Sequence, residues 1–215
     1  MKKSWVKSLC LILLIVIVGL AFLSACNEET ESQERKLKIL DKNYSSLEEL
    51  TLAAPFDFNV IDNYMIREFS TDNHKAIDFF SYGGVEAIPF LAMQDSYVMK
   101  VEAKKMEQKG SENWAVSVIV GLNSKYGMIM GFETFSPDDE IGAKQTNNIF
   151  VKEGDYIKKG DIIGNLIVGD SDSSHVHFNI FDFSNDKWSH VKPEPFFTKE
   201  AIEQISSRLE STLKK

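Results

Sequence analysis

The stretch VKEGDYIKKGDIIGNL, residues 151–166, decides the fold class. Two Gly-Asp pairs, at 154–155 and 160–161, stand on either side of a short apolar segment. Glycine adopts left-handed backbone angles without strain, and aspartate bonds to its own neighbouring backbone, so both pairs are typical of tight turns. The stretch therefore predicts a β-hairpin with closely spaced turns.

Short apolar or alternating runs occupy most of the chain between about residues 55 and 185. They are AIDFF, YVMKVEAKKM, WAVSVIVGL, YGMIMGFETF and DIIGNLIVG. Their length and alternation are typical of β-strands. Long helical segments do not alternate with them, which argues against a parallel α/β fold. We therefore expect a mainly β, antiparallel sandwich.

The four histidines of the chain include two that stand two residues apart, His175 and His177, in SSHVHFNIFDF. On a strand these side chains share one face, about 6–7 Å apart. The segment NHKAIDFF supplies His74 and Asp78. Imidazole nitrogen and carboxylate oxygen are both ligands of zinc. Because residues four apart on an extended strand are about 13 Å apart, His74 must lie on a loop or bend before the strand of Asp78 if the two are to share an ion.

Three segments in this order, HKAIDF, the 151–166 hairpin and SSHVHFNI, resemble the lysostaphin/LytM-type zinc metallopeptidases, peptidase family M twenty-three, over roughly residues 60–195. The resemblance implies a barrel-sandwich hybrid fold (duplicated hybrid motif) with short flanking helices. It implies zinc bound by His74, Asp78 and His177, with His175 as a non-ligand imidazole that handles protons or polarises the scissile carbonyl. Members of the family cut peptide bonds in peptidoglycan.

The chain departs from the family pattern between these motifs. A Y-x-H-L-S-like segment of the family corresponds here to GFETFSPDD, which places Thr134 where the family has a histidine. The sequence has no histidine between His74 and His175, so shifting the alignment cannot supply the missing family histidine. Thr134 or Glu133 could assist His175 instead. Asn179 stands where the family usually has Glu, and His190 is expected to be a surface residue.

Three functions fit this pattern. The first is a membrane-anchored zinc metallopeptidase in which a metal-activated water attacks a peptide bond of peptidoglycan. The second is a catalytically inactive zinc-binding domain that binds cell wall or regulates another hydrolase. The third is a metal-free lipoprotein adaptor of the barrel-sandwich type, in which His74, Asp78 and His177 would not converge. A carrier domain is disfavoured, because VMKVEAKKM is only loosely similar to a carrier's Met-Lys-Met triplet.

The N-terminus begins with lysines and continues into the apolar run LCLILLIVIVGLAFL, which ends at LSAC. This order is typical of a secretory signal. LSAC resembles the lipobox of bacterial lipoproteins, so we expect a signal peptide at 1–25, a lipidated Cys26, a polar tether over 26–50, and an extracytoplasmic location on the bacterial cell membrane. An uncleaved transmembrane helix is the alternative.

Residues 51–197 are expected to form the peptidase-like domain and residues 198–215 a C-terminal helix capped by Thr198. The helix is predicted from the spacing of its apolar residues. The chain has 24 basic and 32 acidic side chains and a net charge of −8, which argues against nucleic-acid binding. Expected partners are peptidoglycan, the membrane through the lipid, and a regulatory protein.

Overall fold

A computed structural model describes residues 50–56, 64–67, 69–81, 87–108, 110–168, 174–184 and 187–209. The predicted signal peptide 1–25, Cys26 and the tether as far as residue 49 lie outside the described residues. Within the described part, none of the helices has the length and apolar character needed to cross a membrane.

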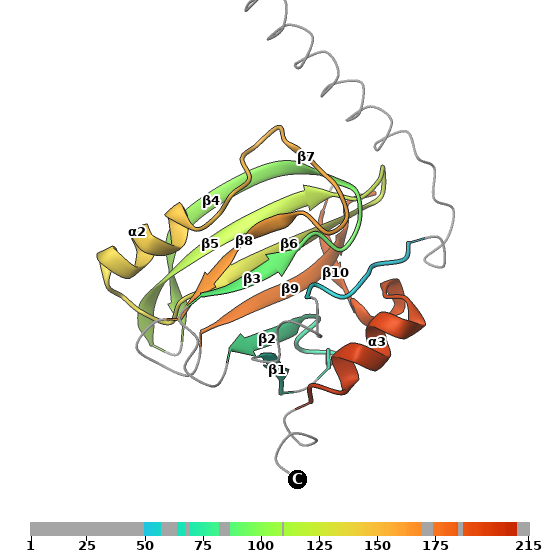
Figure 1. The fold of residues 1–215 in the computed structure, drawn as a ribbon, viewed down its shortest axis with the longest axis horizontal. Helices are drawn as coiled ribbons and strands as arrows, with labels where there is room; N and C mark the ends of the chain where they lie inside the picture. The colour runs from blue at the N-terminus through green and yellow to red at the C-terminus, as the bar shows by residue number, and fades with distance from the viewer. Residues whose placement is uncertain are drawn as a thin grey trace, which may run out of the picture. The chain divides into compact units, whose positions relative to one another are not determined.

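Most strands belong to one eight-stranded antiparallel sheet, shown in Figure 1. Along the sheet the order is β1-β2-β9-β6-β5-β4-β7, and β10 pairs with β9. The strands are β1 Tyr64–Ile66, β2 Ile77–Ser81, β4 Ser96–Gln108, β5 Ser111–Gly121, β6 Tyr126–Glu133, β7 Tyr156–Ile157, β9 His175–Asp182 and β10 Ser189–Val191. A second sheet pairs β3 Ala87–Leu91 with β8 Ile162–Ile167. The predicted mainly β, antiparallel fold with short flanking helices is confirmed.

Alternation along β9 divides the two faces of the large sheet. Val176, Phe178 and Ile180 are fully buried and belong to the main hydrophobic core. The β3–β8 ribbon covers this face, because Phe90 of β3 packs edge-on against Phe132 of β6 with ring centroids 5.9 Å apart. Burial of each large apolar side chain contributes about 1.5–3 kcal/mol. The opposite face of β9 therefore presents His175 and His177 away from this core.

The two Gly-Asp turns of 151–166 are present and have the same construction. Gly154 and Gly160 have φ of 95° and 90°, the left-handed region that favours glycine. Asp155 accepts a hydrogen bond from the Lys152 backbone N–H at 2.9 Å, and Asp161 accepts one from that of Lys158 at 2.8 Å. Each turn is thus closed by its own aspartate.

The predicted hairpin pairing between the strands that flank these turns is wrong. β7 pairs with β4 of the large sheet, whereas β8 pairs with β3 of the small one. The backbone N–H groups of the two turn glycines explain the difference, because Gly154 donates to Val98 at 3.0 Å and Gly160 donates to Ala92 at 2.8 Å. The segment is therefore a bridge between the two sheets.

In the described ranges, two α-helices and a 3₁₀ turn flank the sheets: α2 Asp139–Asn147, α3 Lys199–Ser206 and η2 Glu194–Phe196. Thr198 caps α3 as predicted, because its side chain accepts from the Ala201 N–H at 3.0 Å. The helix ends at Ser206, earlier than expected, and Leu209 beyond it forms an isolated bridge with Ile66. Ile205 is fully buried, so α3 packs on the domain.

Gly127 of β6 offers a test of how closely β6 packs against the neighbouring strands β5 and β9. A Cβ at Gly127 would lie 2.3 Å from the Phe181 ring and 2.8 Å from the Val120 carbonyl oxygen. Gly127→Ala should therefore lower the free energy of unfolding by about 1–3 kcal/mol, measured by urea denaturation. Its paired residue Gly121 is the matched control, because a Cβ there makes an ordinary 3.4 Å contact with Met99. Equal stability of the two alanine variants would contradict the packing described.

Candidate metal and catalytic site

β9 lies between β2 and β6, and the pairing of these strands assembles the site. Asp78 of β2 is directly opposite His177 of β9, and His177 is opposite Gly131 of β6. Residues paired in this way have Cβ atoms about 4.5–5.5 Å apart on one face of a sheet. Asp78 and His177 therefore meet because of the strand register.

His74 reaches the same place from the loop before β2. A turn closes this loop, because the Thr71 N–H donates to the His74 carbonyl at 2.8 Å and the His74 N–H donates to the Thr71 hydroxyl at 3.1 Å. The His74 Nε2 lies 3.5 Å from Asp78 Oδ2. The bend that the sequence required between His74 and Asp78 is present.

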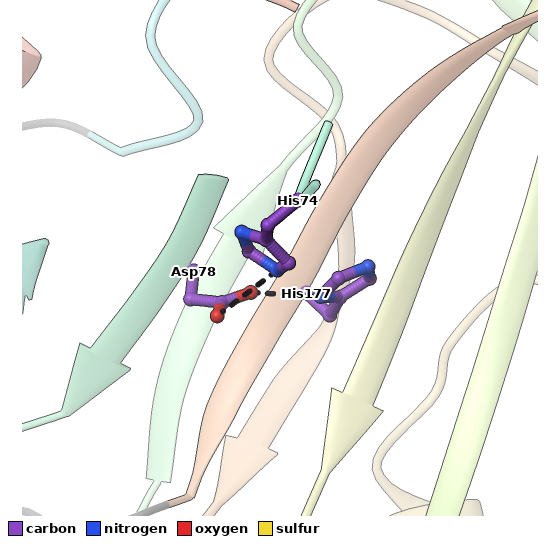
Figure 2. A group of neighbouring side chains, drawn as sticks. All are labelled: His74, Asp78 and His177. Atoms are coloured by element: carbon purple, nitrogen blue, oxygen red, sulfur yellow. Dashed lines mark hydrogen bonds and ion pairs between the residues drawn. The ribbon is translucent and has the colours of Figure 1, made fainter. Parts of the chain in front are cut away.

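The three predicted ligand residues converge, as Figure 2 shows. His177 Nδ1 is 2.8 Å from Asp78 Oδ1, at hydrogen-bond distance. The rings of His74 and His177 are 5.2 Å apart between centroids. One donor atom from each of the three residues lies within 4.8 Å of the others. All three side chains are partly exposed, so solvent and small ligands can reach the group.

The contacts between these residues shift the protonation of two of them. Burial raises the pKa of Asp78, but the His177 hydrogen bond and the nearby histidines outweigh it, and the net pKa lies below the ordinary value of 3.8. Burial lowers the pKa of His177, but its hydrogen bond to Asp78 outweighs it, and the net pKa lies above the ordinary value of 6.5. The pair therefore favours a carboxylate beside an imidazolium.

His175 lies beside this group without being part of it. It is 5% exposed, and the rings of Phe80 and Phe135 pack on it at 4.6 and 5.2 Å between centroids. Its Nε2 is 3.4 Å from Glu133 Oε2 and 3.6 Å from Asp78 Oδ1. The two carboxylates thus flank one ring nitrogen of an imidazole whose orientation is held by aromatic packing.

Glu133, and not Thr134, is the residue of β6 that faces the site. Glu133 is directly opposite His175 in the sheet and is 8% exposed. Thr134 is fully buried, and its hydroxyl donates to the Trp114 carbonyl oxygen at 2.9 Å. Sequence alignment pointed to Thr134 as the replaced position, but side-chain alternation along β6 places Glu133 on the face of His175 and His177.

His190 is exposed, as expected, but it also lines a pocket with ligand candidates. It lies on β10 opposite Phe181, on the same face of the sheet as His177. The pocket has a volume of about 430 Å³ and includes His74, His177 and Asn179. The sequence could not place His190 here, because the β9–β10 pairing that brings it close was not among the predicted elements.

A second set of donors, Glu133, His175 and His177, also lies within 4.8 Å. It shares His177 with the first set, and two of its three side chains are buried. Among the described residues, these are the two groups of at least three such side chains that could bind a metal ion.

Comparison with known proteins finds similarity to solved structures. Protein-family models do not match the chain, and curated proteins do not match it either. Among solved structures, the chain is similar to the NMR solution structure of lysostaphin, with 19% sequence identity and a TM-score of 0.39. The match covers 72% of this chain and 58% of that chain. The chain therefore spans somewhat more than half the length of lysostaphin in that structure.

The stability of the metal-free protein should depend on pH through the Asp78–His177 pair. The lowered pKa of Asp78 gives stability that is lost as pH falls through that pKa, below 3.8. The raised pKa of His177 gives stability that is present below 6.5 and is lost as pH rises through the raised value. In the presence of a metal chelator, the pair should therefore stabilise the protein by about 1 kcal/mol at pH values between the pKa of Asp78 and that of His177.

Thermal unfolding of the wild type and Asp78→Asn in EDTA across this pH range measures the effect. The difference in melting temperature should be largest between the two pKa values and should shrink on both sides. A constant difference across the range would contradict the pair's role.

Proposed function

We propose that the protein is a zinc-dependent peptidase that acts on peptide bonds of peptidoglycan. The observation that carries the proposal is the convergence of His74, Asp78 and His177 at a partly exposed point, next to the buried His175–Glu133 pair. Two ligand atoms of a tetrahedral zinc, each about 2.0–2.2 Å from the ion, lie roughly 3.3–3.6 Å apart. The His74–Asp78 separation of 3.5 Å has this length.

The first donor set fits a catalytic zinc better than the second. Catalytic zinc sites combine three protein ligands with an open position for water or substrate. His74, Asp78 and His177 are all partly exposed, whereas Glu133 and His175 are buried. Zinc at the first set would not use Glu133 and His175 as ligands, so this pair could transfer protons. The His177–Asp78 hydrogen bond of 2.8 Å would open on metal binding, with loss of the proton that it holds.

Bound zinc would lower the pKa of a coordinated water toward 7 and polarise the scissile carbonyl. The chain's own residues supply the proton transfers. His175 Nε2 would accept a proton as the peptide carbonyl is attacked and would deliver it to the leaving amine. Glu133 Oε2, 3.4 Å away, would stabilise the protonated ring. General acid–base catalysis of this kind is worth about 10²–10⁴ in rate.

Peptidoglycan is proposed as the substrate because the HKAIDF and SSHVHFNI motifs, with the Gly-Asp turns between them, resemble cell-wall peptidases. We also propose that Cys26 carries a lipid anchor and that the domain acts outside the cytoplasm, since an apolar run typical of a secretory signal precedes the lipobox-like LSAC. A regulatory protein partner is a further expectation.

An inactive zinc-binding domain is the second candidate. The loss of a histidine from the middle motif favours it. Glu133 weighs against it, because a carboxylate beside His175 retains a pair able to hold and move a proton. The metal-free adaptor is disfavoured, because it predicted that the three ligand candidates would lie apart.

Metal content and wall digestion test the function. The full-length chain, extracted in mild detergent, should bind one equivalent of zinc and release muropeptides from purified peptidoglycan. His175→Ala should keep the metal and lose at least 10²-fold in rate, because it removes the proton carrier. Zinc without digestion of several wall types would support the inactive domain, and digestion at the normal rate by His175→Ala would refute the role of His175.

The roles of Glu133 and Thr134 can be distinguished by replacing each residue with histidine. Glu133→Gln should lower kcat by about tenfold or more, whereas Glu133→His should retain more activity, because an imidazole there also faces His175. Thr134→His should not improve activity and should lower the melting temperature, because Thr134 is buried and bonded to Trp114. Greater activity of Thr134→His than of Glu133→His would contradict the conclusion that position 133, and not position 134, faces the site.

A further inference from the structure

The pocket beside the proposed metal ligands has a composition of its own. Its volume is about 430 Å³, and it lies between the 72–76 loop, β9 and β10. His74 and His177 form one wall. The remaining lining residues are Asp72, Asn73, Lys75, Ala76, Asn179, Ser189 and His190. A group bound in the pocket would therefore lie next to the proposed zinc ligands and would contact residues that have no role in the proposed hydrolysis.

Asn179 is a buried polar side chain without full hydrogen bonding. It is 7% exposed, and its Oδ1 is buried without a partner. A buried, unpaired polar atom lowers stability, so such a residue calls for a functional explanation. Asn179 Nδ2 is not among the buried atoms without a partner. We therefore assign Nδ2 as the atom of Asn179 that faces the pocket. Asn179 thus offers a donor where a glutamate would add a negative charge.

The charged groups of the pocket favour an anion. Asp72 is paired with Lys192 at 2.9 Å. Lys75, by contrast, has no acidic partner within 4.0 Å in the part of the chain that the structure describes. Burial, and then the charges of His177 and Lys75, lower the pKa of His190, which indicates that the Lys75 charge reaches into the pocket. Ser189 and Asn73 also line the pocket and carry no charge.

We propose that this pocket binds a carboxylate of the substrate, so that the enzyme prefers peptides with a free carboxyl group on the residue next to the scissile bond. The proposal rests on the peptidase function proposed above. Lys75 would supply the charge, and Asn179 Nδ2 would donate a hydrogen bond. Hydrogen bonds to a charged group are the stronger kind, so they can discriminate a carboxylate from a neutral amide. An ammonium group would instead be repelled by Lys75.

Binding of a matched pair of probes tests this pocket. N-acetylglycylglycine and its C-terminal amide differ only in the carboxylate. The full-length chain should bind the acid about tenfold or more tightly than the amide, measured by calorimetry. Because a carboxylate can also bind zinc directly, the measurement is repeated in EDTA, where the preference should persist.

Variants assign the preference to residues. Lys75→Gln and Asn179→Asp should each weaken binding of the acid about tenfold and leave the amide unchanged. Lys144→Gln is the control, because Lys144 lies on α2, which packs against β5 and β8. Zinc content of each variant is measured in parallel, because Lys75 adjoins His74.

The outcomes separate the pocket from the peptidase. Equal binding of acid and amide overturns the carboxylate pocket even if zinc and hydrolysis are found. A preference that disappears in EDTA and survives Lys75→Gln belongs to the metal and also overturns it. Zinc-free protein that still prefers the acid through Lys75 and Asn179 would support the pocket while the peptidase function failed.

Discussion

The direct opposition of Asp78 and His177 on adjacent strands, marked by a 2.8 Å hydrogen bond between them, is the constraint on which the site depends. This opposition exists only in one register of β2 against β9. A slip of one residue would turn every side chain of a strand to the other face. The same slip would move Val176 and Phe178 out of the core. Core packing therefore holds the ligand geometry, and the site needs little stabilisation of its own.

The Gly-Asp turns contribute to this register from outside the site. Through Gly154 the first turn bonds to Val98 of the large sheet, and through Gly160 the second bonds to Ala92 after β3. β8, which follows, places Ile163 and Leu166 in the core that β9 also lines. The repeated turn thus positions the small sheet over the face of β9 opposite the histidines. Because the core fixes the inner face, the outer face can carry polar groups whose burial lowers stability, such as His175 and Glu133.

Local sequence patterns predicted the strands and the three converging residues, and they failed where contacts between distant segments decide. His74, Asp78 and His177 could be found because their spacing, with a bend after His74, matches the ligand pattern. Alignment with the family pattern favours Thr134 over Glu133, because it does not show which side chains of a strand share a face, whereas alternation from the buried Phe132 does. β7 was assigned to a hairpin, because turn residues reveal a turn but not which strand pairs next. His190 is exposed, as predicted, but its place in the pocket beside His177 could not be predicted, because β10 has no recognisable strand pattern.

The site combines three partly exposed side chains that could bind one metal ion with a buried imidazole between two carboxylates. The central claim is that zinc binds the first group and does not bind Glu133 and His175. An anomalous difference map from crystals of the zinc-loaded protein, collected at the zinc absorption edge, tests it most directly. The account predicts one peak about 2.0–2.2 Å from His74 Nε2, an Asp78 carboxylate oxygen and His177 Nδ1. A peak bound instead by Glu133 and His175, or no peak at either group, would contradict it.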